Sequence, residues 1–341
     1  MSAQTLTGRA TAALAAGGLR RYVPIGATVL LLALMYTGGL ANYRNFDNPQ
    51  LVPDLFIGNA GLLIIAVGMT FVILSGGIDL SVGSVMAFST MACAWLTVDA
   101  GISAPLAFAM VLALGTLSGT LTGAVIHYFN VQPFIATLVG LFLYRGLTLQ
   151  ISDEDVSMRD VAGIGWGMER TEFGNVRDGG FSLPNLSFLA LAVVLVAFVV
   201  LHYTRFGRGV YAVGGSEQSA LLMGLPVART KIGVYAVSGF CAALAGVVSA
   251  FYTKSANPLA GVGLELDAIA AVVIGGTLLT GGAGFVLGTV AGVMVTGMLS
   301  TIIAFQGDLN SWWAKIVVGV LLLAFILLQR VLARSGEKRR T

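Results

Sequence analysis

Ten apolar segments, each long enough to cross a bilayer as a helix, follow one another along this chain. They are residues 23–41, 57–75, 82–98, 104–128, 132–150, 185–203, 232–252, 263–280, 284–305 and 312–333. Only 10% of the 341 residues are charged and 57% are hydrophobic, whereas soluble domains carry about 25% charged residues. The sequence therefore predicts an all-α membrane protein with about ten transmembrane helices.

Two junctions between these segments are very short. Residues 76–81 (GGIDLS) separate the second segment from the third, and residues 281–283 (GGA) separate the eighth from the ninth. Irregular backbone at membrane depth is tolerated only where it is buried in protein or lines a cavity. At both junctions, a true loop and a broken or re-entrant helix remain alternatives.

The basic residues predict the orientation, because short cytoplasmic loops carry an excess of Lys and Arg. With the N-terminus inside, the inner loops and tails hold twelve basic residues and the outer loops five. Residues 1–22 lack the pattern of a cleavable signal peptide. They are expected to form one cytoplasmic tail and residues 334–341 the other, on either side of one transmembrane domain, 23–333. Residues 151–184, with seven acids and three arginines, are the expected periplasmic loop.

Two segments carry glycines at every fourth position. These glycines are Gly115, Gly119 and Gly123 in one segment and Gly284, Gly288 and Gly292 in the other. The spacing places them on one helix face, as in close helix packing. The two segments are five spans apart, which predicts an inverted repeat of the kind found in transporters. A competing likeness joins residues 76–81 to residues 275–280, six spans apart in the same orientation.

Asp79 is the one acid in the spans that lies away from their outer ends. A buried acid must be hydrated, paired or used as a helix cap. Asp79 or Ser81 is placed to cap the third segment, and Asp79 is also placed on a solute path or its gate. Glu265 and Asp267 start the eighth segment, where they complement the helix dipole or line the outer mouth. Arg145 is expected to reach the interface or pair with an acid.

Asn59 and Thr70 are polar residues of the second segment. They are eleven residues apart, which is about three helical turns, so a straight helix would place them on one face. Either they hydrogen-bond between packed helices or that face lines the pathway.

The inner segment 204–231 contains the signals of a short helix. Ser216 is a candidate N-cap, and Gly224 followed by Pro226 is a stop signal. The predicted helix has about two turns and is too short to be stable alone. It is expected to dock either on the spans of this chain or in a groove of a cytoplasmic partner.

Missing motifs exclude several classes of function. The chain has no GxxxxGK[ST] phosphate loop and no HExxH spacing, so it is not expected to hydrolyse ATP by the P-loop route or to hold a catalytic zinc. Its net charge of +3 is spread over loops and tails, so no nucleic-acid partner is expected. An ion-coupled secondary transporter is the alternative to an ATP-driven one. It would need a relay of ionisable groups inside the spans, and Asp79 is the one candidate acid for it.

Five stretches together resemble the ribose-type sugar ABC importer permeases. They are residues 68–83 (GMTFVILSGGIDLSVG), 133–138 (PFIATL), 204–208 (TRFGR), 217–224 (EQSALLMG) and 265–277 (ELDAIAAVVIGGT). Where the family often has Asn after the paired glycines of the inner loop, this chain has Ser216, and both residues cap helices. Residues 259–263 (LAGVG) and 311–315 (SWWAK) look more narrowly like one of the two permease subunits of the galactofuranose importer.

The resemblance implies a type II ABC-importer-like permease in the bacterial inner membrane that imports galactofuranose or a related pentose or hexose. Its implied partners are a second, different permease, a periplasmic sugar-binding protein and a cytoplasmic ATPase that binds the ATP and Mg²⁺, with no cofactor in this chain. The expected ATPase-coupling residues are Arg205, Arg208, Glu217, Ser219, Ala220 and Gly224. The expected path or gate residues are Asn59, Thr70, Ser75, Gly76, Gly77, Asp79, Phe134, Thr137, Glu265, Asp267, Gly275 and Gly276.

Overall fold

The computed structural model describes residues 23–174, 180–307, 310 and 312–337. The first half holds α2 (Val23–Asn42), α3 (Leu51–Gly58), α4 (Ala60–Leu74), α5 (Val82–Ala94), its π-helical extension η1 (Trp95–Asp99), α6 (Ala104–Tyr128) and α7 (Pro133–Ile151). The second half holds α8 (Asn185–Tyr203), α9 (Arg205–Gly215), α10 (Glu217–Leu222), α11 (Val227–Thr253), α12 (Leu264–Ile274), α13 (Val286–Gln306) and α14 (Trp312–Glu337). The predicted N-terminal tail, 1–22, lies outside the described residues, and α14 continues past the predicted boundary at 333.

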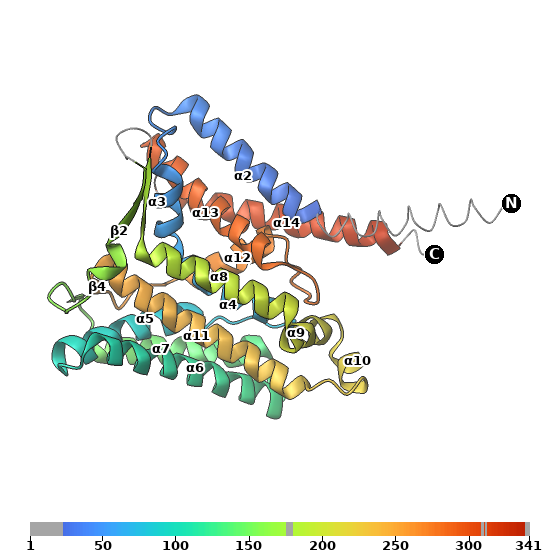
Figure 1. The fold of residues 1–341 in the computed structure, drawn as a ribbon. Coiled ribbons are helices and arrows are strands. Elements are labelled where there is room, and N and C mark those ends of the chain that lie inside the picture. The colour runs from blue at the N-terminus through green and yellow to red at the C-terminus, as the bar shows by residue number, and fades with distance from the viewer. Residues whose placement is uncertain (1–22, 175–179, 308–309, 311, 338–341) are drawn as a thin grey trace.

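The loop after α7 is built from short elements at one end of the molecule (Figure 1). β1 (Val156–Ser157) pairs antiparallel with β4 (Ser255–Ala256), and β2 (Arg170–Phe173) pairs antiparallel with β3 (Phe181–Pro184). The 3₁₀ turn η2 (Trp166–Met168) precedes β2. The two strand pairs give the predicted 151–184 loop a fixed shape over its described residues.

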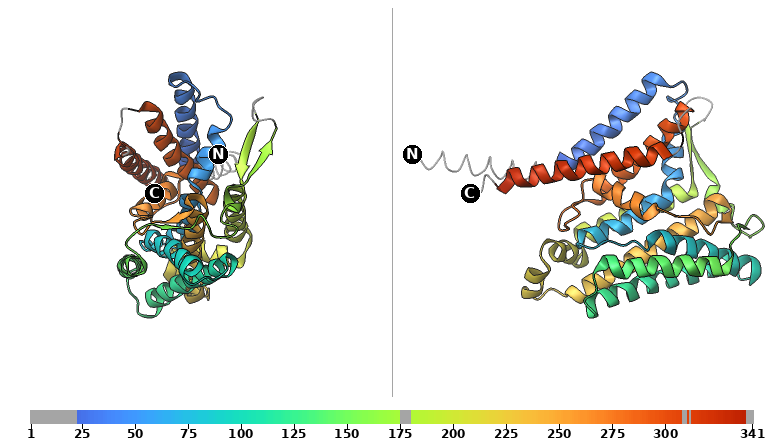
Figure 2. Two further views of the ribbon diagram at one scale, coloured as in Figure 1. Left: turned by 90° about the vertical axis from the view of Figure 1, so that its left-hand side faces the viewer. Right: turned by 180° about the vertical axis from the view of Figure 1, so that it is seen from behind.

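Helix α11 is the centre of the fold. It packs along α6, α4 and α5, and α5, α11 and α13 are mostly buried inside the protein. By contrast, α2, α7 and α14 are mostly exposed. In both views of Figure 2, α2 and α14 lie at one edge of the molecule and α6 and α7 at the opposite edge. These outer helices therefore present their apolar side chains to lipid or to another membrane subunit.

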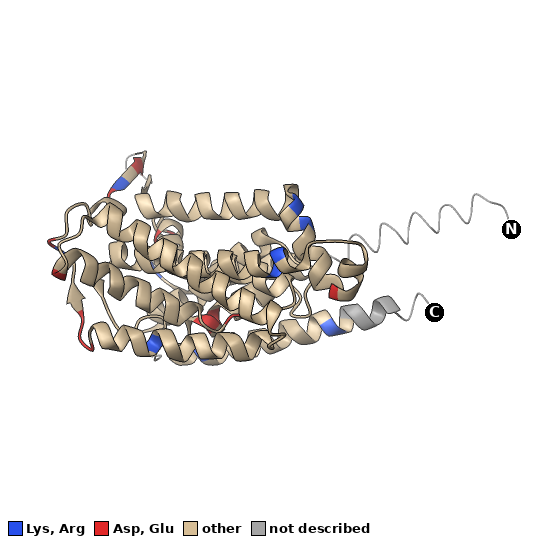
Figure 3. Ribbon diagram, turned by 90° about the horizontal axis from the view of Figure 1, so that it is seen from below, with Lys and Arg blue, Asp and Glu red and all other residues tan. Residues whose placement is uncertain are grey.

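The two ends of the molecule differ in charge. Helices α9 and α10 lie at the end where α2 begins and α14 finishes (Figure 1). Basic residues gather toward this end and acids toward the opposite one, where the strands lie (Figure 3). The arrangement agrees with the charge pattern from which the orientation was predicted.

Among the described residues, eight single helices are long and apolar enough to cross a membrane. The pair α3 and α4 makes a ninth span, but it is bent by 58°. The predicted straight helix 57–75 is therefore wrong: the helix begins earlier, at Leu51, and bends at Asn59. Asn59 is the N-cap of α4, so Asn59 and Thr70 still share a face of that helix, and both contact α13, at Gly297 and Thr289 respectively.

The predicted helix 263–280 is also wrong in its second half. Helix α12 has 11 residues, which at 1.5 Å per residue is about 16 Å and too short to cross a bilayer alone. It ends before Gly275 because the next residue, Gly276, has φ = +95°, a conformation that favours glycine. Both junctions are non-helical, over residues 75–81 and 275–285, and the two alternatives of a loop and a broken helix stay predictions.

The glycines of α6 confirm the predicted close packing. A Cβ on Gly115 would lie 2.8 Å from the Gly239 carbonyl oxygen, and one on Gly123 would lie 2.8 Å from the Ile232 Cα, both in α11. In the second glycine series, Gly288 and Gly292 pack on α12, whereas Gly284 precedes α13. The five-span inverted repeat stays a prediction.

We expect Gly119→Ala to lower the free energy of unfolding by about 1–3 kcal/mol, the usual cost of overpacking. A Cβ at this position would overlap the Tyr235 carbonyl oxygen. The measurement is denaturant unfolding of the purified chain in detergent. The matched control is Gly146→Ala on α7, where a Cβ meets nothing within 4 Å. Equal stability of the two variants would contradict the close packing of α6 on α11.

Candidate functional site

The backbone break after α4 is a glycine-terminated helix end. Gly76 has φ = +84°. Its N–H donates to the Ile73 carbonyl (2.9 Å), and the Gly77 N–H donates to the Val72 carbonyl (3.0 Å). This pair of bonds is the Schellman motif, which satisfies carbonyls that the end of a helix leaves without partners. Ser75 also contributes, because its hydroxyl donates to the Val72 carbonyl (2.8 Å).

The break after α12 repeats this geometry. Gly276 has φ = +95°, and its N–H donates to the Val273 carbonyl (2.9 Å), while the Thr277 N–H donates to the Val272 carbonyl (3.2 Å). Position for position, Gly276 corresponds to Gly76 and Thr277 to Gly77. The two glycine-rich stretches therefore share the same helix-end geometry, in a register one residue away from the one that the sequence suggested.

The two breaks touch each other and α9. The Gly282 N–H donates to the carbonyl of Leu74, the last residue of α4 (2.9 Å). A Cβ on Gly214 would overlap that same carbonyl oxygen, and one on Gly281 would lie 2.9 Å from the Gly76 nitrogen. The Tyr211 hydroxyl on α9 donates to the Gly284 carbonyl (2.9 Å). We call this contact of Leu74, Gly76, Gly214, Gly281 and Gly282 the glycine junction.

Asp79 is buried in the break after α4, and both of its carboxylate oxygens accept hydrogen bonds. Its Oδ1 accepts from the Ser81 N–H (2.9 Å) and the Ser81 hydroxyl (2.6 Å), and its Oδ2 accepts from the Ser238 hydroxyl on α11 (2.7 Å). Thr137 on α7 is also buried here, with its hydroxyl 3.4 Å from the Ile78 carbonyl. The predicted side-chain cap is absent, since Ser81 at the N-cap position of α5 makes no side-chain bond to the first turn, and Asp79 instead binds Ser81 itself; the path role stays a prediction.

A polar pocket of about 290 Å³ lies beside the bend between α3 and α4. Asn59 lines it, and its side-chain amide donates to the Leu55 carbonyl (2.7 Å). Asp267 from α12 and Lys315 from α14 also line the pocket and form an ion pair. The lining also includes the hydroxyl-bearing residues Ser249, Tyr252, Thr296 and Ser300, together with apolar residues such as Ile57, Leu62, Met86 and Val248. The volume suits a small polar solute, because drug-sized pockets run from about 300 to 1,000 Å³.

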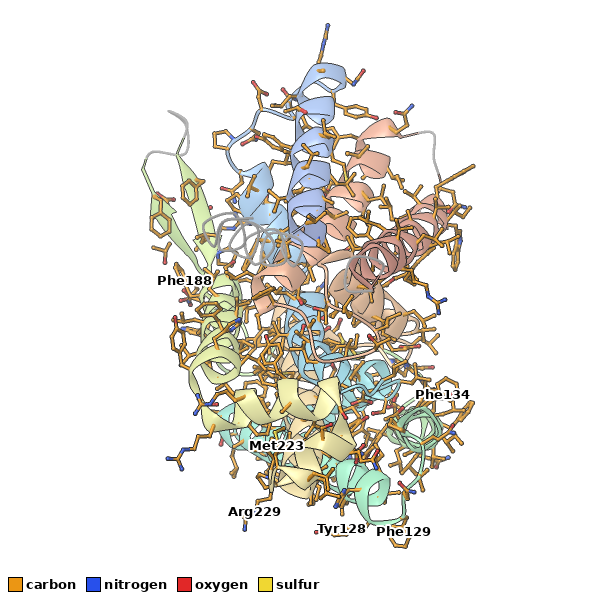
Figure 4. All side chains as sticks on the ribbon, turned by 90° about the vertical axis from the view of Figure 1, so that its right-hand side faces the viewer. Tyr128, Phe129, Phe134, Phe188, Met223 and Arg229 are labelled. Atoms are coloured by element: carbon orange, nitrogen blue, oxygen red, sulfur yellow. The ribbon has the colours of Figure 1, made fainter. Side chains whose placement is uncertain are left out.

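The other predicted path residues lie outside this pocket. Thr70 is buried between helices, with its hydroxyl 2.7 Å from that of Thr289 on α13. Glu265 lies beside Gly83, and Gly275 packs on Gly288. Phe134 is exposed at the edge of the molecule (Figure 4). Arg145 donates to the carbonyls of Pro258 and Ala260 (3.0 Å each), so it ties the 257–263 loop to α7.

The short helix of the inner segment is confirmed as α10. The Ser216 hydroxyl caps it by accepting from the Ser219 N–H (3.2 Å), and Gly224, with φ = +73°, follows its end. Ala220 is fully buried against Val213 and Val227. Glu217 pairs with Lys231 at 2.6 Å. These contacts dock α10 on its own chain.

The C-terminal end of α10 is apolar and uncovered. Leu221 is 65% exposed, Leu222 is 83% exposed and Met223 is 68% exposed, and Figure 4 looks onto Met223 from this end of the molecule. An exposed apolar patch at a helix end is typical of a protein–protein contact. The predicted coupling residues were Arg205, Arg208, Glu217, Ser219, Ala220 and Gly224, and this prediction, which stays untested, did not include the three exposed side chains between Ala220 and Gly224.

Sequence reasoning also missed α9 and Lys315. Helix α9 has a clear signal, because Thr204 is an N-cap residue and its hydroxyl accepts from the Gly207 N–H (3.2 Å). Lys315 had no local signal, since only the fold brings it to Asp267. Among the described residues, no group of three or more His, Cys, Asp or Glu is placed to hold a metal ion.

With the fold and the site described, the chain can be compared with known proteins. The family model described as "Branched-chain amino acid transport system / permease component" matches residues 56–326. The chain belongs to this family. No solved structure matches the chain.

Curated relatives agree with the family assignment. The chain is 43% identical to the inner membrane ABC transporter permease protein YjfF of Escherichia coli, over 95% of this chain and 96% of that protein. It is 42% identical to the fructose import permease FruG of Bifidobacterium longum, over 94% of each chain. It is also 42% identical to the ribose import permease RbsC of Escherichia coli, over 77% of this chain and 80% of that one. The likeness to ribose-type sugar ABC permeases is confirmed, and the chain is a transport subunit rather than an enzyme.

Asp79→Asn should keep close to full transport activity, because an amide oxygen can accept the two bonds from Ser81 and its nitrogen can donate to Ser238. Asp79→Leu should lower transport strongly, since it leaves buried donors unsatisfied at a cost of about 1–3 kcal/mol each. The measurement is solute uptake by cells that express equal amounts of each variant. Loss of uptake in Asp79→Asn at normal abundance would instead indicate a proton relay.

Proposed function

We propose that this chain is one of two permease subunits of an ATP-driven importer for galactofuranose or a related pentose or hexose. The observation that carries this proposal is the uncovered apolar end of α10. Helix α9, which directly precedes α10, ends at the glycine junction. A transporter that another protein drives needs a contact for that protein and a mechanical link from it to the pathway. Helix α10 supplies the contact, and α9 with the glycine junction supplies the link.

The polar pocket is the proposed part of the pathway that handles the sugar. Carboxylate, amide, ammonium and hydroxyl groups together can replace the water hydrogen bonds of a sugar. Ala314 and Lys315, which belong to the stretch that resembles a galactofuranose importer permease, both line the pocket. The printed names of other relatives refer to fructose, ribose and D-allose, so a monosaccharide is the class of solute that these likenesses support.

The proposed mechanism is alternating access driven through α10. Closure of two nucleotide-binding domains on ATP would push α10, and its anchors at Ala220 and Glu217 would pass the displacement to α9 and α11. The end of α9 abuts the carbonyl of Leu74, so the same displacement reaches α4 and the loop after α12. The permease would hold the sugar weakly, because a tight site would slow its release.

The proposed partners follow from this division of labour. A cytoplasmic ATPase that binds ATP and Mg²⁺ would contact Leu221, Leu222 and Met223, a periplasmic protein would deliver the sugar at the strand-bearing end, and a second, different permease would complete the pathway. Both termini would be cytoplasmic and the membrane would be the bacterial inner membrane, as the name of the YjfF relative states for that protein.

Leu222→Asp should assemble in the membrane yet lower transport and transport-stimulated ATP hydrolysis on the order of tenfold or more, the scale of removing a buried interface anchor. The substitution places a charge on the side chain that is 83% exposed in this chain alone. The measurements are uptake, ATP hydrolysis and co-purification of the ATPase. Leu222→Met, which conserves volume, should behave like the unaltered chain. Normal ATPase co-purification and uptake with Leu222→Asp would contradict the coupling role.

Lys315→Met should slow galactofuranose uptake roughly tenfold, the scale of losing one hydrogen bond to a charged group. It removes a polar group from the pocket and leaves Asp267 without its partner. The measurement is uptake of labelled sugar into proteoliposomes that contain the complete transporter and its binding protein. Lys315→Arg keeps the charge and is the control. Unchanged uptake with Lys315→Met would remove the pocket from the pathway, and unaltered transporter that takes up ribose in preference to galactofuranose would overturn the choice of sugar.

A further inference from the structure

A groove with three arginines lies between α9 and the start of α11. It has a volume of about 750 Å³ and is lined by Arg205, Arg208 and Arg229 together with apolar or small residues: Phe206, Gly209, Ala212, Leu225, Pro226 and Thr230. Its lining contains no acid. Arg229 is visible at the α10 end of the molecule in Figure 4. The groove is therefore positively charged at its rim and apolar inside.

The three arginines have no partner in the part of the chain that the structure describes. The ion pairs there involve Arg170, Lys231 and Lys315, and the one acid of α10, Glu217, is taken by Lys231. All three arginine side chains are exposed. Three unpaired guanidinium groups around one groove attract an anion, and the planar guanidinium suits phosphate in particular.

The surface next to the groove is apolar and exposed. Helix α8 exposes Leu191, Leu195, Val199 and Tyr203, which are spaced four residues apart and so form one stripe along the helix. Arg205 follows two residues after the end of this stripe. Tyr203 is 70% exposed at that end, as expected of a tyrosine at the membrane–water interface. An acyl chain that lies along α8 would bring its headgroup to the arginines.

We infer that this groove binds the phosphate headgroup of an anionic phospholipid from the adjacent leaflet. Basic pockets between transmembrane helices on the cytoplasmic side are suited to such headgroups. The apolar interior of the groove accommodates the glycerol and the upper acyl chain, and the arginines hold the phosphate. The bound lipid would fix the start of α9 next to the glycine junction, so membrane composition would influence the segment that follows α8.

The test compares phosphatidylglycerol with phosphatidylcholine of the same acyl chains, counted on the purified full-length chain by native mass spectrometry. The unaltered chain should prefer phosphatidylglycerol, and the triple variant Arg205→Gln, Arg208→Gln, Arg229→Gln should lose that preference by roughly tenfold or more. The triple Lys variant should keep most of it, since it retains the charge. Arg330→Gln, an exposed arginine on α14 outside the groove, is the matched control and should behave like the unaltered chain.

An unchanged lipid preference in the triple Gln variant would overturn the inference. So would a variant that keeps phosphatidylglycerol but no longer co-purifies with the ATPase, because the arginines would then serve an acidic surface of that subunit. If the triple variant does not fold, the three single Gln variants are measured, and full preference in all three overturns the inference equally.

Discussion

The hydrogen bond from the Gly282 N–H to the Leu74 carbonyl joins the two places where helices stop inside the protein. In lipid an unpaired backbone group costs several kcal/mol, so a helix can end at depth only if protein satisfies its last carbonyls. At each break, Schellman bonds pair some of the last helix carbonyls within the same segment. The Leu74 carbonyl at the end of α4 is paired instead by the Gly282 N–H, which belongs to the other break. Neither break is therefore independent of the other, and both depend on the approach of α9.

The close approach of α9 to the two breaks requires glycine at the points of contact, because glycine has no side chain. The contact of Gly214 with Leu74 and of Gly281 with Gly76 leaves no room for a Cβ. Positive φ values at Gly76, Gly281 and Gly282 add a second reason for glycine at three positions of the junction. The glycine-rich stretches that suggested weak span boundaries are thus sites of close backbone contact.

The sequence predicted what local patterns determine. Apolar length located eight spans and most of the bent ninth, the Ser216 cap and Gly224 stop located α10, and the paired glycines Gly76 and Gly77 located the break after α4. It failed where distant residues decide the outcome. The bend at Asn59 arises in an apolar run with no proline at that point, and α12 stops because Gly276 takes a positive φ, although residues 263–280 are continuously apolar enough to span. The pocket needed Lys315 to come from α14 to Asp267, 48 positions away, and no spacing rule predicts such a pair.

The glycine junction determines how a displacement of α10 would reach α4 and the loop after α12. Side-chain contacts change by rotamer jumps, each with its own preferred positions, whereas glycine-to-glycine backbone contacts can shift only when whole segments move. The start of α10 is separated from Gly214 by Gly215 and Ser216 alone, and Ala220 and Glu217 fix the helix to α11. A displacement of α10 therefore reaches α9 through the packing of Ala220 on Val213 as well as through the two linking residues. Because Gly214 lies against the Leu74 carbonyl without room for a Cβ, movement of α9 would displace the end of α4 and the loop after α12 together.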